Sequence, residues 1–222
     1  MVTQIQVIGS GRVGSAVAAR LGERGLEVGA DRPELVLLCV PDSEIAGVAS
    51  SVPVGPWVAH VSGATPLAAL APHDRRFSVH PLQTFTRTRG AEQLDGAWAA
   101  VTAESADALA TARWLAETLG LRPFELADSA RTLYHAGAVF ASNYLVTLQR
   151  AASLLFDAAG APPEALEPLM RRTIENGFEL TGPIARGDWA TVTAHRAAIE
   201  AARPELDNLY ETLAGATLAL AT

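Results

Sequence analysis

The sequence predicts an α/β domain built on a parallel sheet, followed by an all-α domain. As far as Leu126, short runs rich in apolar and β-branched residues alternate with helical stretches. That alternation is typical of a parallel sheet whose faces are covered by helices. From Asp128 onward no strand pattern remains. We therefore expect an α/β domain over residues 1–127, ending at Ala127, and a helical domain over residues 128–222.

The individual elements follow from hydrophobic period and from turn residues. The expected strands are Gln4–Ile8, Leu35–Val40, Trp57–Val61, Arg76–His80, Ala97–Thr102 and Leu121–Leu126. The expected helices are Gly14–Arg24, Ser43–Val52, Pro66–Ala71, Ala106–Gly120, Asp128–Ala159, Pro163–Leu180, Asp188–Ala202 and Pro204–Ala221. Asp188 is a suitable N-cap, and Pro204 suits a first helical turn.

Composition limits the class of protein. The 222 residues are 49% hydrophobic, which is enough for one large or two small domains with a core. No apolar run approaches the roughly 20 residues of a membrane helix, and no signal-peptide pattern precedes the first strand. The single cysteine, Cys39, excludes a disulfide scaffold, and no spacing of His, Asp or Glu indicates a metal site. We expect a cytoplasmic protein.

The charged residues narrow the chemistry. A net charge of −7 argues against a nucleic-acid surface. All 17 basic residues are arginine, so Schiff-base chemistry and a lysine general acid are excluded. Near neutral pH, the proton-transfer candidates are therefore the five histidines, namely His60, His73, His80, His135 and His195.

A glycine-rich turn joins the first strand to the first helix. It reads Gly9-Ser10-Gly11-Arg12-Val13-Gly14, the spacing of a Rossmann-like dinucleotide-binding turn. The first glycine permits the tight turn, the second lets a pyrophosphate approach, and the third lets helix and strand pack. We expect these six residues to contact NADP or NAD, although a purely structural turn is the alternative. The turn Val40-Pro41-Asp42 would border the nicotinamide; otherwise Asp42 is a helix cap.

The second strand of such a domain is expected to be missing. If Glu27–Ala30 formed it, only Asp31 to Glu34 would remain to return the chain to the next strand. A parallel crossover needs about a dozen residues. We therefore expect an abbreviated Rossmann-like sheet that lacks the second and third strands, with Gln4–Ile8 at its edge. Asp31 would then face away from any cofactor, and the adenine-ribose half-site would be lost.

Four sequence blocks resemble a known family: HVSGAT, RFSVHPLQTF, LYHAGAVFASNYL and LTGPIARGDWATVTAHRAA. They resemble an uncharacterised family that pairs a Rossmann-like domain with a C-terminal helical domain of unknown function. That family is similar to the 6-phosphogluconate dehydrogenase-like group, beside ketopantoate reductases, β-hydroxyacid dehydrogenases, pyrroline-5-carboxylate reductases and prephenate dehydrogenases. The resemblance implies an NAD(P)-dependent oxidoreductase that forms a homodimer through its helical domain.

Candidate catalytic residues lie on the first long helix and at a strand end. Arg131, His135, Ser142 and Gln149 fall within about 40° on a helical wheel, which indicates either a cleft-facing stripe or a satisfied network between helices. The resemblance places His135 where related reductases carry a lysine acid, and Asn143 where they carry an asparagine. A histidine can protonate a carbonyl oxygen as hydride arrives. A structural histidine is the alternative for His135.

His80 ends the strand RFSVHP, at the sheet edge where ligands bind. The resemblance to prephenate dehydrogenases, which use a similar His-Pro pair, makes it a second catalytic candidate; otherwise the turn merely ends the strand. Of the remaining histidines, we expect His60 in the core, His73 in a surface loop and His195 on a helix surface.

Substrate contacts are expected from four residues. Ser62 and Gly63 follow a strand and resemble the substrate-binding Ser-Gly turn of the group, although a helix cap explains them equally well. Ser142 shares the polar stripe of His135. Arg186 can reach a substrate carboxylate, or pin its loop by pairing with Asp188.

Together these residues indicate hydride transfer between NAD(P)H and a small carbonyl compound or 2-keto acid. The alternative is a catalytically silent ligand-binding or assembly module that retained the fold after losing the cofactor half-site.

Overall fold

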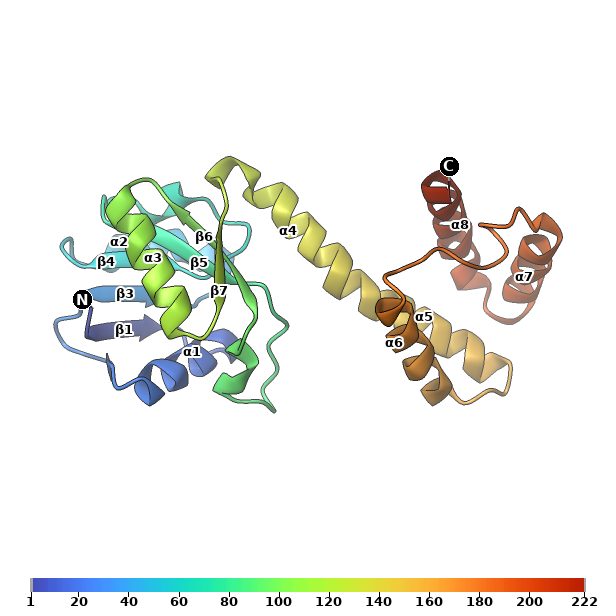
Figure 1. Cartoon of the computed structure of the whole chain (residues 1–222), viewed down its shortest axis with the longest axis horizontal. Helices are drawn as coiled ribbons and strands as arrows, with labels where there is room; N and C mark the ends of the chain where they lie inside the picture. The colour runs from blue at the N-terminus through green and yellow to red at the C-terminus, as the bar shows by residue number, and fades with distance from the viewer. Residues whose placement is uncertain (1, 222) are drawn as a thin grey trace. The chain divides into compact units, whose positions relative to one another are not determined.

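Seven strands in the first part of the chain form one sheet, and only helices follow it. The computed structural model describes residues 2–221 and divides into two units, one ending at Phe140 and one beginning at Ala141. Figure 1 shows the strands confined to the first unit. The predicted α/β class with a helical C-terminal part is confirmed.

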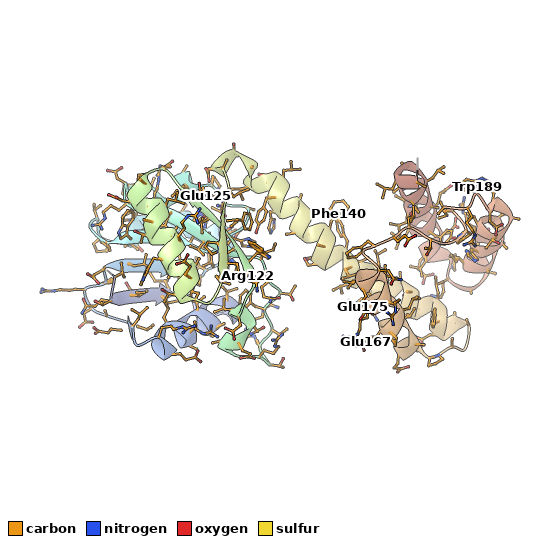
Figure 2. The ribbon with its side chains drawn as sticks, in the orientation of Figure 1. Arg122, Glu125, Phe140, Glu167, Glu175 and Trp189 are labelled. Carbon is orange, nitrogen blue, oxygen red and sulfur yellow. The ribbon has the colours of Figure 1, made fainter. Side chains whose placement is uncertain are left out.

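The strand order in the sheet is β2-β1-β3-β4-β5-β6-β7. The bounds are β1 Gln4–Ile8, β2 Glu27–Val28, β3 Leu35–Leu38, β4 Trp57–His60, β5 Arg76–Pro81, β6 Trp98–Ala103 and β7 Arg122–Glu125. The two ends of β7, Arg122 and Glu125, are labelled in Figure 2.

One pairing departs from the expected parallel sheet, because β5 and β6 are antiparallel. The segment between them contains only the 3₁₀ turn Ala91–Leu94 and no crossover helix. Without a crossover the chain re-enters the sheet at the edge it left, which reverses the strand direction.

The expectation that the second strand is missing, and that β1 lies at the edge, is wrong. β2 pairs in parallel with β1 through Gln4↔Glu27 and Ile5↔Val28, on the side opposite β3. The crossover argument fails because β2 stops at the level of Ile5, where Leu35 of β3 also pairs. The chain therefore never has to return from the far edge of the sheet. Within the described sheet, β2 is the edge strand and nothing lies where a third strand would follow it.

Helices cover both faces of the sheet. α1, Arg12–Glu23, and α3, Ala106–Thr118, pack their apolar side chains against one face, in a core that includes Val17, Leu21 and Leu115 (Figure 1). α2, Ile45–Ser51, and a 3₁₀ turn, Leu67–Leu70, cover the other face. The expected helix at Pro66–Ala71 is thus only this short turn.

The long helix expected over Asp128–Ala159 is divided. It consists of a 3₁₀ turn Asp128–Ala130, α4 Arg131–Val139, a π-helical turn Phe140–Tyr144 and α5 Leu145–Ala158. A π turn has more residues than an α turn, so the helical-wheel angles predicted for Ser142 and Gln149 do not hold beyond Val139.

Three further helices complete the second unit: α6 Leu166–Glu175, α7 Trp189–Ala202 and α8 Asp207–Ala221. α6 ends before the expected Leu180 because Gly177 and Phe178 both have positive φ angles, of 68° and 61°. Asp188 caps α7 as expected, since its carboxylate accepts from the Thr191 N–H at 3.1 Å. No helix within residues 2–221 is long and apolar enough to cross a membrane.

Replacing Gly14 by alanine is expected to destabilise the first unit. A Cβ at Gly14 would lie 1.9 Å from the Gly9 carbonyl oxygen and 3.1 Å from the Cβ of Cys39. Backbone must move to relieve this overlap, so the free energy of unfolding should fall by about 3 kcal/mol in denaturant titrations. Gly22, on the same helix, is the matched control because nothing lies within 4 Å of its Cβ position. Gly22→Ala should gain about 0.5–1 kcal/mol from helix propensity. Equal effects of the two substitutions would contradict the packing role of Gly14.

Candidate active site

The glycine turn lies at the carboxyl edge of β1, and packing accounts for two of its three glycines. Gly9 has a φ of 112°, and its Cβ would lie 2.4 Å from the Cys39 carbonyl oxygen. Gly14 is required by the contact described above. Gly11 has nothing within 4 Å of its Cβ position, and it N-caps α1 without any side-chain hydrogen bond. The amino end of α1 thus faces open space, the arrangement in which helix N-termini bind anions.

A pocket of about 250 Å³ adjoins this turn. One wall is formed by Ser10, Gly11, Arg12 and Ser15, and the other by the segment from Thr86 to Ala91. The neighbouring turn after β3 lies at the same edge, because Cys39, which precedes Val40, Pro41 and Asp42, pairs its N–H with the Ile8 carbonyl at 2.7 Å.

Two histidines and a tyrosine meet at the carboxyl ends of β4 and β5. His80 Nδ1 lies 2.8 Å from the Tyr134 hydroxyl, and the ring centroids of His80 and His135 are 6.2 Å apart. A Cβ at Gly63 would lie 2.8 Å from atoms of both imidazoles. Only glycine therefore lets the turn after β4 approach the two rings this closely. The sequence missed Tyr134, whose only signal was its place beside His135.

Ser62 uses its hydroxyl within the protein. The side chain is buried; its Oγ donates to Asp42 Oδ2 at 2.8 Å and accepts from the N–H groups of Ala64 and Thr65 at 3.2 and 2.9 Å. These bonds connect the turns after β3 and β4. The hydroxyl is thus already engaged in holding those turns, and Asp42 is engaged by Ser62.

Arg131 attaches α4 to the sheet. Its buried guanidinium donates to Ser78 Oγ at 2.6 Å, to Thr102 Oγ1 at 2.9 Å and to the Ser62 carbonyl. Asp128, one turn earlier, lies 3.9 Å away and offsets part of the charge. The network expected between helices therefore joins a helix to a sheet instead. Because Tyr134 and His135 follow on the same helix, Arg131 fixes where they lie over β4 and β5.

Burial keeps two histidines of this site uncharged near neutral pH. His60 is fully buried, as expected, and burial followed by the charges of Arg131 and His80 lowers its pKa to about 3. For His80, burial followed by the charges of His135 and Arg131 lowers the pKa to about 4. Burial raises the pKa of Tyr134 to about 12. A neutral imidazole thus stands beside a protonated phenol.

The remaining predicted residues lie elsewhere. His73, expected in a surface loop, is buried, with Nε2 at 2.9 Å from the Ala49 carbonyl oxygen, because its loop folds back onto α2. His195 is exposed, as expected, and contacts the Tyr210 hydroxyl at 2.8 Å. Asp31 is exposed in the loop after β2.

Three predicted residues belong to the second unit. Ser142 and Asn143 lie in the π turn, where Ser142 Oγ donates to Asn143 Oδ1 at 3.0 Å. Arg186 precedes α7, and its charge contributes to lowering the pKa of Asp188, after that carboxylate's hydrogen bonds to Thr191.

Stability should depend on pH through His60. Its pKa in the folded protein, about 3, lies below the usual 6.5, so only the unfolded chain takes up a proton as the pH falls from 6.5. The free energy of unfolding should then fall by about 1.4 kcal/mol per pH unit for this residue, and likewise for His80 until its own pKa is reached. Denaturant titrations between about pH 7 and pH 5 measure this slope.

The matched variant is His60→Asn, because His60 Nδ1 accepts the Ser62 N–H at 3.2 Å and an asparagine oxygen can replace it. The variant should lose the contribution of one proton and show roughly half the histidine-dependent slope. An unchanged slope would mean that His60 is protonated in the folded protein.

Comparisons with known proteins agree with this architecture. A family model described as "Domain of unknown function (DUF2520)" matches residues 97–217. No curated protein matches the chain.

Several solved structures share the fold at low sequence identity. The crystal structure of a "putative NADP oxidoreductase" from Bacteroides fragilis superposes with a TM-score of 0.82 at 21% identity, covering 98% of each chain. A protein from Thermotoga maritima gives 0.77 at 23% identity, over 98% of this chain and 97% of that one. A reductive aminase from Aspergillus terreus, in complex with NADPH and ethyl levulinate, gives 0.71 at 17% identity, over 98% and 93%.

Proposed function

The chain belongs to the DUF2520 family, and from this premise we propose that it is an NAD(P)-dependent oxidoreductase acting on a small carbonyl compound or 2-keto acid. The observation that carries the proposal is the convergence of His80, Tyr134 and His135 at the carboxyl edge of the sheet that also holds the glycine turn. A proton donor and a nucleotide-binding turn on one sheet edge are what a carbonyl reductase needs. A place in the 6-phosphogluconate dehydrogenase-like group is part of the proposal.

The glycine turn fits a dinucleotide diphosphate. Gly11 leaves open space at the amino end of α1, and the adjoining pocket is lined by three arginines together with small and hydroxyl-bearing residues. The ribose side fits less well, since β2 ends at Val28, at the level of Ile5 and short of the cofactor edge. Gly9 to Gly14 would hold the diphosphate, and Val40, Pro41 and Asp42 would border the nicotinamide. A nicotinamide held there would supply the hydride for reduction of a substrate carbonyl carbon.

The side chains of the site would supply the proton that reduction of a carbonyl group requires. Reduction of a carbonyl leaves negative charge on oxygen, which must be protonated or hydrogen-bonded. In the proposed mechanism His135 donates that proton. His80 accepts a hydrogen bond from the Tyr134 hydroxyl, and the pair stays neutral because burial opposes charge on either ring. Gly63 lets the turn after β4, the predicted substrate-binding turn, approach both imidazoles closely. Asn143 remains a predicted catalytic residue, and Ser142 and Arg186 remain predicted contacts to substrate.

A cofactor titration followed by a turnover assay tests the proposal. NADPH and NADH are titrated against the chain, with quenching of its four tryptophans as the signal. Oxidation of the bound cofactor is then followed with a panel of small aldehydes, ketones and 2-keto acids. His135→Ala should lower kcat by roughly 100-fold and change cofactor affinity little, as expected of a general acid. His195→Ala, at an exposed histidine also paired with a tyrosine, is the control and should leave kcat unchanged.

One result would reject the oxidoreductase, and another would change only its mechanism. If neither NADPH nor NADH binds, the catalytically silent ligand-binding or assembly module is favoured. Turnover that persists in His135→Ala would remove His135 from the mechanism and leave the Tyr134 hydroxyl, which lies beside His80, as the proton donor.

We also propose that the second unit assembles with a second copy of the chain, because much of its apolar surface is exposed. Its described residues include only three buried hydrophobic side chains: Leu166, Val192 and Ile199. Large apolar side chains are exposed on several of its helices, among them Leu145, Val146, Leu148, Leu169, Ile174, Leu213 and Leu218, as is Trp189, labelled at the start of α7 in Figure 2. A helical unit of this size needs more buried apolar area than it has alone. A second copy of the chain would cover this surface with matching side chains.

Sedimentation at micromolar concentration should therefore give a mass near twice the 23.2 kDa of one chain. Leu148→Glu should shift the equilibrium toward the monomer, because a carboxylate would be buried at the contact. Glu167→Gln, on the exposed and charged side of α6, is the control. A mass near that of one chain for the unsubstituted protein would contradict the dimer.

A further inference from the structure

Three arginines face the pocket beside the glycine turn. Arg12 comes from the first turn of α1, and Arg87 and Arg89 come from the segment after β5. Within residues 2–221, neither Arg12 nor Arg87 forms an ion pair, and Arg89 has only a 3.7 Å contact with the exposed Glu92. Like charges gathered around one hollow repel each other, and an anion bound in the hollow relieves that repulsion.

The segment that carries two of these arginines is ordered by one buried side chain. The amide of Gln93, almost completely buried, donates to the carbonyl oxygens of Arg89 and Gly90 at 2.8 and 3.0 Å, and its oxygen accepts the Thr86 N–H at 2.7 Å. Both ends of the segment from Thr86 to Gly90 are thus fastened to one group. The loop backbone is pre-ordered, so the entropy lost when its arginines bind a ligand is mainly that of their side chains.

The same segment is fastened to the helix of the glycine turn. Buried Arg20, on α1, donates to the Ala91 carbonyl at 2.9 Å and to Asp95 at 2.6 Å. The backbones of the two pocket walls are therefore held together, and the loop arginines begin beside the amino end of α1.

Because β2 is short, the arginine charges become important for holding the ligand by its phosphate groups. β2 ends at Val28, after two residues, so the strand end that usually reads the ribose lies below the cofactor edge. Binding energy lost there has to come from another part of the ligand. Of the remaining groups of the ligand, the phosphates can bind most strongly, since guanidinium–phosphate hydrogen bonds are charge-assisted and bidentate.

We propose that Arg12, Arg87 and Arg89 form an anion clamp that holds the phosphate groups of the ligand seated on the glycine turn. Resting on the proposed function, that ligand is the dinucleotide, and its diphosphate lies between the helix end and the loop. The shared chemistry is a diphosphate ester, whether it is carried by NADPH, by NADH or by inorganic pyrophosphate.

Isothermal titration calorimetry on the full chain tests the clamp with three probes: NADPH, NADH and inorganic pyrophosphate. The variants are the double substitution Arg87→Ala/Arg89→Ala and the single substitution Arg12→Ala. All three side chains are exposed, so the variants should unfold at the same temperature as the unsubstituted chain. The double variant should bind its nucleotide and pyrophosphate at least about 10-fold more weakly, and its affinity should depend less on salt concentration.

Arg32→Ala is the charge-matched control. Arg32 is also exposed, and it lies in the loop after β2, on the side that usually reads the ribose. Its loss should change the affinity less than twofold. If Arg32→Ala weakens binding and the double variant does not, the clamp is wrong and the truncated strand still selects the ligand.

The probes separate the clamp from the proposed function. Nucleotide binding that the double variant leaves intact overturns the clamp alone. Pyrophosphate binding that depends on the arginines, without binding of either nucleotide, supports the clamp and rejects the oxidoreductase. Failure of all three probes to bind rejects both.

Discussion

The position of the candidate active site depends on one buried guanidinium. Arg131 connects α4 to β5, to β6 and to the turn after β4 through Ser78, Thr102 and the Ser62 carbonyl. Burial lowers its pKa, yet three oxygen acceptors and nearby Asp128 satisfy the charge. Removing one partner of such a network leaves buried polar groups unsatisfied, which costs several kcal/mol. The helix that carries Tyr134 and His135 is therefore held in one place over the sheet.

The same charge influences the histidines around it. Arg131 lowers the pKa of both His60 and His80, adding to the larger effect of burial. His60 and His80 are thus kept neutral, which limits their electrostatic repulsion with the guanidinium. Neutral His80 can accept a hydrogen bond from Tyr134 but cannot supply a proton near neutral pH. That division of roles is the physical reason for proposing His135 as the acid.

Sequence patterns predicted the strands that carry a dense apolar run, such as β3 and β4, and the N-cap at Asp188. They failed for β2, because its two residues are held by backbone hydrogen bonds, from Glu27 to Thr3 and from Gly29 to Ile5, and have no side-chain pattern. The π turn was also missed, since nothing in FASNY distinguishes it from an α-helix. His80 and His135 were found as single candidates. Their approach through Gly63 depends on three elements distant in sequence, which no local period encodes.

Truncation of β2 and the ordered loop after β5 are best understood together. The second strand stops at the level of Ile5, short of the edge where an acidic residue usually contacts the ribose. The glycine spacing is nevertheless complete, although packing alone does not require Gly11, since a Cβ there would meet nothing within 4 Å. Gln93 and Arg20 donate buried hydrogen bonds to backbone carbonyls of the loop after β5. The exposed side chains of that loop contribute little to the core. Buried polar groups of this kind stabilise a geometry rather than a fold. Here they stabilise a loop that places Arg87 and Arg89 opposite the amino end of α1. In the proposed clamp, this loop is the reason that the glycine turn is retained beside a short β2.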